Sequence, residues 1–187
     1  MILPVYVYGW PLLRKKSEEI TPAYPGLQQL VADMFETMYQ ADGVGLAAPQ
    51  VGLSIRLIVI DGSPMASDDK PDDPLHAFKK VLINPVITDR GGTEWTTDEG
   101  CLSFPKIRES VKRPEWIQIS YADEHFQPHS ERYDGIRARI IQHEYDHIEG
   151  SLFIDKISPL RRKLIAGKLA AITKGKVACE YKIKIFK

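Results

Sequence analysis

The segment from His143 to His147 reads H-E-Y-D-H, and this H-E-x-x-H pattern most narrowly limits what the chain can fold into. On a helix, side chains four residues apart lie one turn above each other, so His143 and His147 can reach one metal ion. Glu144 follows the first histidine and can act as a base toward a water molecule that the ion activates. The segment therefore predicts a catalytic metal site on a helix.

The spacing of apolar residues places this motif in a mixed fold. A first helix is predicted over residues 27–40, where apolar residues recur every three or four positions. A second helix, over residues 135–149, carries the motif, and Ile136 and Ile140 share a face with its histidines. Strands are predicted at 57–60, 81–87 and 116–121. These elements predict an α+β fold with antiparallel sheets packed around the motif helix.

The remaining segments predict one domain with a surface loop and a structured tail. A chain of 187 residues is long enough for one core and short for two, so residues 1–187 are expected to form a single domain. Residues 61–74 are rich in Asp, Ser and Pro and predict a solvated loop. Ser158 is expected to cap a third helix. Apolar residues alternate with polar ones over 177–185, which predicts a terminal strand with Cys179 in the core.

Charge is balanced over the whole chain but not along it. The 25 basic and 25 acidic side chains give no overall reason to bind nucleic acid or membrane. Residues 159–187, however, carry nine Lys or Arg against Glu180, a net charge of about +8 that leaves about −8 for the remainder. Two cysteines make no disulfide framework, and we find no signal peptide and no membrane span, so a cytosolic protein is expected.

Two histidines leave a catalytic metal site one protein ligand short. No His follows His147, and a Glu further along the chain stays open by spacing alone. The strongest upstream candidate is Cys101, because a thiolate binds zinc or ferrous iron well and Gly100 permits a close backbone approach. Taken by itself, a lone cysteine is more often a small buried hydrophobe, and the residues alone leave both interpretations open.

Three segments together resemble the signatures of the peptide deformylase family. The first signature, G-x-G-L-A-A-x-Q, is matched by residues 43–50, which read GVGLAAPQ. The second, E-G-C-L-S, is matched by residues 99–103, and the third, H-E-x-D-H, by residues 143–147. The three stand in the family's order, and the resemblance spans nearly the whole chain. The loop at 61–80 and the tail after Lys176 lie outside the signatures.

The resemblance implies a bacterial-type metal-dependent hydrolase that removes the N-formyl group from the initiator formyl-methionine of nascent polypeptides and releases formate. The metal ligands it implies are Cys101, His143 and His147. One divalent ion is expected, Fe²⁺ natively, while Zn²⁺ or Ni²⁺ also suits a thiolate and two imidazoles in purified protein. Glu144 would be the catalytic base, with the Gln50 side-chain amide and the Leu102 N–H as donors to the oxyanion.

The resemblance also suggests how substrate is held. Ile136 and Ile140 are expected to line a methionine pocket, and Arg108 is expected to contact the peptide. Backbone at Gly43, Val44 and Gly45 is expected to pair with an extended nascent chain. Formyl-methionyl nascent peptides are the expected partners in the bacterial cytoplasm. The basic region 159–187 favours RNA phosphates near the ribosomal exit, although a solvated charged face is an equal alternative.

Several residues have a structural interpretation beside the functional one. Gln50 could be an ordinary loop amide outside its motif. Glu99 is expected to be a structural carboxylate that braces the site rather than a catalytic group. Arg139 lies one turn before His143 and could reach the pocket mouth, but a solvated helix flank is the expected position. Exposed positions are predicted for His76, His125 and His129.

Two rival functions share the H-E-x-x-H pattern. An endopeptidase would need a third ligand downstream, and no His follows His147. A binding protein with a structural metal would usually offer four protein ligands with several cysteines, whereas this chain offers one plausible Cys. Activity on formyl-methionyl peptides beside internal peptide bonds would separate the first rival, and a Glu144→Gln variant would separate the second.

Overall fold

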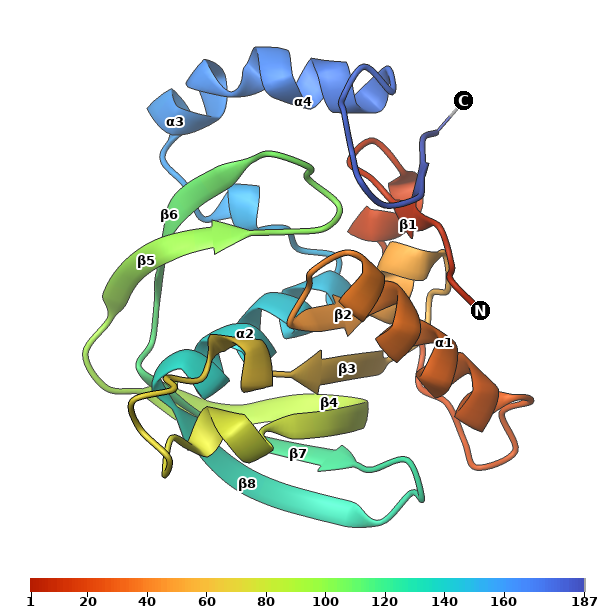
Figure 1. Cartoon of the computed structure of the whole chain (residues 1–187), viewed down its shortest axis with the longest axis vertical. Helices are drawn as coiled ribbons and strands as arrows, with labels where there is room; N and C mark the ends of the chain where they lie inside the picture. The colour runs from red at the N-terminus through yellow and green to blue at the C-terminus, as the bar shows by residue number, and fades with distance from the viewer. Residues whose placement is uncertain (187) are drawn as a thin grey trace.

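A five-stranded sheet forms the centre of the computed structural model, which describes residues 1–186 (Figure 1). All its neighbouring strands are antiparallel. Their order is β2 (Gly45–Ala47), β3 (Leu57–Asp61), β4 (Lys79–Gly91), β7 (Trp116–Ala122) and β8 (Pro128–Asp134). Ile58 pairs with Leu82 between β3 and β4, and β2 forms one edge of the sheet. The segment that carries the first signature therefore contains the edge strand of the sheet.

Two helices cover opposite faces of this sheet. Ile58 of β3 packs in the apolar cluster that includes α2 (Gly135–Ile148), while the next residue, Val59, packs in the cluster that includes α1 (Leu27–Gln40). Successive side chains of a strand point to opposite faces, so β3 is buried on both sides. This double burial explains why its sequence is a continuous apolar run rather than an alternating one. The predicted α+β class, with antiparallel strands around the motif helix, is confirmed.

A two-stranded hairpin, β5 (Trp95–Gly100) and β6 (Arg108–Arg113), arches over the other side of α2 (Figure 1). The turn between these strands, together with β6, packs through Phe104, Ile107 and Val111 on a third apolar cluster. That cluster also includes Leu169 and Ile172 of α4 (Ala166–Thr173) and Ile165, which joins α4 to α3 (Pro159–Leu164). Short 3₁₀ turns lie at Pro11–Arg14, Ala48–Val51, Ser63–Met65, Pro74–Ala77 and Phe153–Asp155.

The local signals for the helices predict their ends well. α1 spans the predicted residues, and α2 begins at Gly135 and ends one residue before the predicted Glu149. Gly150, which follows, adopts the left-handed conformation with φ of +74°, as a helix-terminating glycine does. The Ser158 hydroxyl accepts a hydrogen bond from the Arg161 N–H at 3.2 Å, so the predicted N-cap of the third helix is confirmed.

The terminal strand is much shorter than predicted. Only β9 (Ile183–Lys184) is extended and paired, in parallel with β1 (Val5–Tyr6). β1 has two residues, so it offers the tail a ladder of only that length. Val177 and Ile185 still face an apolar cluster, as the alternation indicates, but Cys179 is half-buried and its assignment to the core is wrong.

Within residues 1–186, none of the helices combines the length and the apolar character that a membrane crossing requires.

Candidate metal centre

One sulfur and two imidazoles converge between the hairpin and α2. The ligand atoms of Cys101, His143 and His147 all lie within 4.8 Å of one another. Cys101 follows the last residue of β5, and its sulfur lies 3.2 Å from Nε2 of His147. The two histidine rings lie one helical turn apart and meet edge to face, with centroids separated by 5.3 Å. Soft thiolate and imidazole donors in this number fit a divalent transition metal that keeps an open coordination position.

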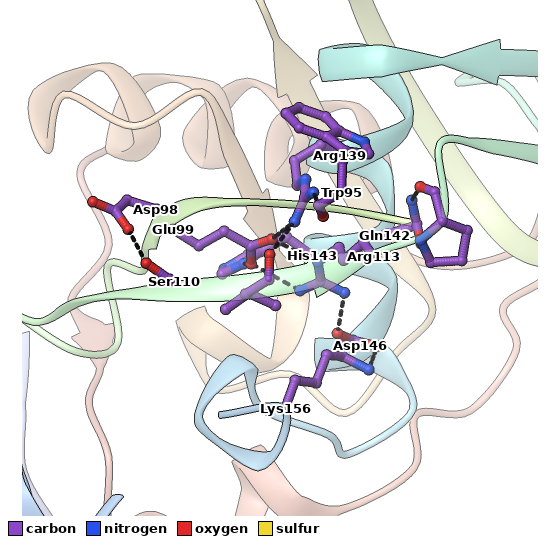
Figure 2. A network of polar contacts seen from close by, with 12 residues as sticks. Trp95, Asp98, Glu99, Ser110, Arg113, Arg139, Gln142, His143, Asp146 and Lys156 are labelled. Atoms are coloured by element: carbon purple, nitrogen blue, oxygen red, sulfur yellow. Dashed lines mark hydrogen bonds and ion pairs between the residues drawn. The ribbon is translucent and has the colours of Figure 1, made fainter. Parts of the chain in front are cut away.

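Figure 2 shows that Glu99 is the centre of a buried polar network behind His143. Its carboxylate accepts hydrogen bonds from Arg113, with distances of 2.6 and 2.8 Å, and from Arg139 at 2.9 Å. It also lies 2.9 Å from Nδ1 of His143. Arg113 reaches on to Asp146, the acidic residue of the H-E-x-D-H motif, at 2.7 Å. Glu99 therefore braces the site, as expected, by joining β5, β6 and α2.

The network sets the protonation of its members in the metal-free protein. Burial alone would raise the pKa of Glu99, but the hydrogen bonds from Arg113 and His143 outweigh it and hold that pKa far below its usual range. Burial would lower the pKa of His143, yet its contacts with Cys101 and Glu99 raise it. His147 is also buried and has no such carboxylate partner, so its pKa is lowered. Metal binding must therefore displace a proton from the His143 imidazole.

Glu144 lies against bare backbone beside this centre. The residue is 5% exposed, and its Oε2 atom has no hydrogen-bond partner in the part of the chain that the structure describes. Burial raises its pKa to about 7. A Cβ atom on Gly45 would lie 2.5 Å from Oε1 of Glu144, so only glycine permits this approach. A carboxylate with a pKa near neutrality and an unpaired oxygen is suited to proton transfer.

The Gln50 amide has only one orientation that satisfies its neighbours. Its Oε1 atom accepts a hydrogen bond from the backbone N–H of Ala47 at 2.8 Å. The amide NH₂ group must then point the other way, toward Cys101 Sγ at 3.5 Å and Ser103 Oγ at 3.3 Å. Gln50 is 1% exposed, so this donor is fixed and aimed at the sulfur ligand rather than free in a loop.

A cavity of about 540 Å³ opens onto these groups. Its lining includes the expected ligands Cys101 and His143, and also Glu144, Gln50 and Leu102. All residues expected to hold substrate line it too, namely Gly43, Val44, Gly45, Arg108, Ile136 and Ile140. All the sequence-based site residues except His147 therefore line one cavity, and His147 joins them through its contact with Cys101.

Arg139 corrects one prediction. It is 5% exposed rather than on a solvated flank, because Glu99, forty residues earlier, supplies a buried partner. Its guanidinium also donates to the carbonyls of Val111 and Trp95, at 2.8 and 2.7 Å. His76 and His125 are exposed as predicted, whereas His129 is half-buried and paired with Asp123 at 2.9 Å.

Sequence reasoning also missed several lining residues. Met65 comes from the loop that was expected only to be solvated, and Tyr181 comes from the tail. Arg113 was not singled out either, although burial alternates along β6 and places Glu109, Val111 and Arg113 inward. No local signal marks Met65, and the alternation over residues 177–185 indicates only that Tyr181 faces inward, because its place at the cavity depends on contacts with distant segments.

Comparisons with known proteins agree with this geometry. A sequence model described as polypeptide deformylase matches residues 2–163. The peptide deformylase of Christiangramia forsetii is 52% identical over 98% of this chain and 96% of its own length, and that of Flavobacterium johnsoniae is 53% identical over the same shares. Among solved structures, a plant peptide deformylase superimposes with a TM-score of 0.81 at 38% identity, covering 92% of this chain and 90% of that one. The Legionella pneumophila peptide deformylase gives 0.80 at 37% identity, over 94% and 98%.

Proposed function

This chain belongs to the polypeptide deformylase family, metal-dependent hydrolases that remove the N-formyl group from nascent peptides, and we propose how its own residues divide that work. The observation that carries the proposal is the convergence of Cys101, His143 and His147 beside the buried carboxylate of Glu144. The metal ligands, the oxyanion donors and the base come from three separate segments of the sequence, residues 43–50, 99–103 and 143–147, so an accidental grouping is a poor explanation.

We assign the metal to those three ligands. The native ion is proposed to be Fe²⁺, and the same thiolate and imidazole donors suit Zn²⁺ or Ni²⁺ in purified protein. When bound, a divalent ion supplies Lewis acidity, which polarises the formyl oxygen and lowers the pKa of water. Glu99 keeps His143 in one tautomer and orientation for this task through its contact with Nδ1.

Glu144 is proposed to move the proton of the reaction. Its carboxylate takes a proton from the attacking water and later delivers it to the amine that leaves the formyl carbon, so formate and a free α-amine result. Negative charge develops on the formyl oxygen during the attack. The fixed NH₂ group of Gln50 and the backbone N–H of Leu102 are proposed to donate hydrogen bonds to it. Loss of one such donor costs about 3–4 kcal/mol of transition-state stabilisation.

The cavity is proposed to bind the side chain of the initiator methionine and to select little of the sequence that follows it. Ile136 and Ile140 lie on the same face of α2 as the ligands and offer apolar surface to an unbranched side chain. The backbone from Gly43 to Gly45 leads into the edge strand β2, where an extended peptide can add as a further strand. Arg108, which also lines the cavity, is proposed to contact the peptide.

The domain organisation, location and partners of the enzyme are proposed as follows. We propose that residues 1–187 form a single catalytic domain. We place the enzyme in the bacterial cytoplasm, where formylated nascent chains arise. Lys163, Lys168 and Lys174, on or next to α3 and α4, are exposed and basic. They support ribosome binding near the exit tunnel through RNA phosphates. Neutralising these three lysines should weaken salt-sensitive ribosome binding, and unchanged binding would refute this role.

The role of Glu144 is tested by formate release from formyl-Met-Ala-Ser. Glu144→Gln keeps the shape of the side chain but cannot accept the proton, so kcat should fall by at least about 100-fold. Glu94→Gln is the matched control, because Glu94 is half-exposed and pairs with Lys112 on the hairpin away from the cavity lining. If Glu144→Gln deformylates at the parental rate, Glu144 is not the catalytic base. Cleavage of internal peptide bonds alone would instead favour an endopeptidase.

A further inference from the structure

The tail after α4 returns to the cavity and is held there by the N-terminal strand. In Figure 1 the C-terminal segment descends from α4 and runs beside β1. The N–H of Val5 donates to the carbonyl of Lys182 at 2.8 Å, and the N–H of Val7 donates to that of Lys184 at 3.2 Å. Trp10 adds a side-chain hydrogen bond to the Lys184 carbonyl at 2.8 Å. The tail therefore has a fixed path past the metal centre.

Along this path, Tyr181 lies at the cavity wall. Glu180 and Lys182 are exposed, whereas Tyr181 between them is half-buried and lines the cavity with Cys101 and Leu102. Its phenol O–H donates to the backbone carbonyl of Leu102 at 2.7 Å. Burial and the nearby thiol of Cys179 raise the pKa of Tyr181, so the phenol stays protonated and able to donate. Tyr181 lies beyond the residues that the family model matches.

Leu102 is held from the remaining sides as well. The next carbonyl, of Ser103, accepts a hydrogen bond from the Tyr8 N–H at 2.9 Å. The Leu102 side chain lies so close to Gly43 that a Cβ there would be 2.9 Å from Leu102 Cδ1. Two consecutive carbonyls of the loop that carries Cys101 are thus anchored by segments from the two ends of the chain. The Tyr181 bond is the anchor on Leu102 itself.

We propose that Tyr181 is a positioning residue for deformylation, which fixes the Leu102 backbone so that its N–H meets the developing oxyanion. The inference rests on the role proposed above for that N–H. A donor stabilises the transition state only when it lies about 3 Å from the oxyanion, so a loop that shifts by a fraction of an ångström loses rate. The simpler alternative is that Tyr181 only fastens the tail to the body of the protein.

Tyr181→Phe removes the hydroxyl and keeps the ring. With formyl-Met-Ala-Ser and full metal occupancy, kcat should fall about 3- to 10-fold while KM changes less than about 2-fold. Hydrogen exchange at the Leu102 amide should become faster. The matched control is Tyr24→Phe, a tyrosine outside the catalytic cavity, which should change neither quantity.

A thioformyl substrate distinguishes a Tyr181 that positions the Leu102 backbone from a Tyr181 that only holds the tail in place. Sulfur is a weaker hydrogen-bond acceptor than oxygen, so its turnover depends less on the oxyanion donors, and the loss caused by Tyr181→Phe should shrink below about 2-fold. Equal losses on both substrates, a lower melting temperature with unchanged kcat, or unchanged Leu102 exchange would overturn the proposal. A parent enzyme that releases no formate would instead refute the proposed function, so the two failures are distinguishable.

Discussion

The Oε2 atom of Glu99 lies 2.9 Å from Nδ1 of His143, and this contact leaves Nε2 as the ring atom available to a metal. Neither residue could hold this geometry alone. Glu99 is itself fixed by two arginines, of which Arg113 comes from β6 and Arg139 from α2. The orientation of the metal ligand His143 therefore depends on β5, β6 and α2 together.

Arg113→Met should be strongly destabilising. It removes both hydrogen bonds from Arg113 to Glu99 and the contact with Asp146, leaving two buried or half-buried carboxylates short of a partner. Breaking a buried pair in this way costs about 3–5 kcal/mol. Urea unfolding would measure the loss. Arg137→Met is the control, because Arg137 pairs with the exposed Asp134 and should cost less than about 1 kcal/mol. Equal losses in the two variants would contradict the assigned importance of the network.

Gly45→Ala should damage catalysis rather than folding. The new Cβ would lie 2.5 Å from Oε1 of Glu144, so the base must move. A displacement of about 1 Å lowers rates by about 100-fold, and kcat on formyl-Met-Ala-Ser should fall by that order. Gly167→Ala is the control, since no atom lies within 4 Å of its added Cβ, and its activity should equal that of the parent. Parental kcat in Gly45→Ala would show that Glu144 is not held where the structure has it.

Glu144→Gln should stabilise the metal-free protein above neutral pH. The carboxyl has a pKa of about 7 when folded and 4.5 ordinarily, so between these values the folded state holds a proton that the unfolded chain has lost. Stability therefore falls as pH rises through that window, and the penalty is full above it. Removing the group should gain on the order of 2–3 kcal/mol at pH 8 and almost nothing at pH 4. Chelator-treated samples unfolded in urea at both pH values provide the measurement, and a pH-independent difference would contradict it.

Metal binding should require Cys101 and strengthen as pH rises. The ligands must lose protons before they bind a cation, and the raised pKa of His143 keeps its imidazole protonated in the metal-free protein. Cys101→Ser should reduce bound metal well below one ion per chain, whereas Cys179→Ser, at a cysteine outside the ligand group, should retain it. Metal analysis under anaerobic conditions, combined with titrations at several pH values, gives both results. Stoichiometric metal in Cys101→Ser would exclude the sulfur as a ligand.

The parts of the site that sequence predicts well are those set by local geometry. Two histidines at helical spacing face one side whatever surrounds them, and the helix ends of α1 and α2 follow from nearby glycines and apolar periodicity. Residues from the other signatures were placed by resemblance, and the fold brings Gln50 and Cys101 to the same cavity.

The parts that sequence missed are set by partners far along the chain. An arginine one turn from His143 is normally solvated, and Arg139 is buried only because β5 brings Glu99 to it. The tail alternates as a strand does, but the pattern carries no information on the length of its partner, and β1 pairs with two residues. The alternation placed Tyr181 on the apolar side of the tail, but only the pairing of the tail with β1 brings it to the cavity.

The pairing of Glu99 with two arginines also restricts how the enzyme can evolve. A single replacement of Glu99, Arg113 or Arg139 removes one charge from a buried network and leaves the remaining charges less well balanced, so each such change costs stability. Glu99 and Arg139 also line the cavity. Resistance to a compound that binds Glu99 and Arg139 should therefore arise slowly, because substitutions there also destabilise the protein.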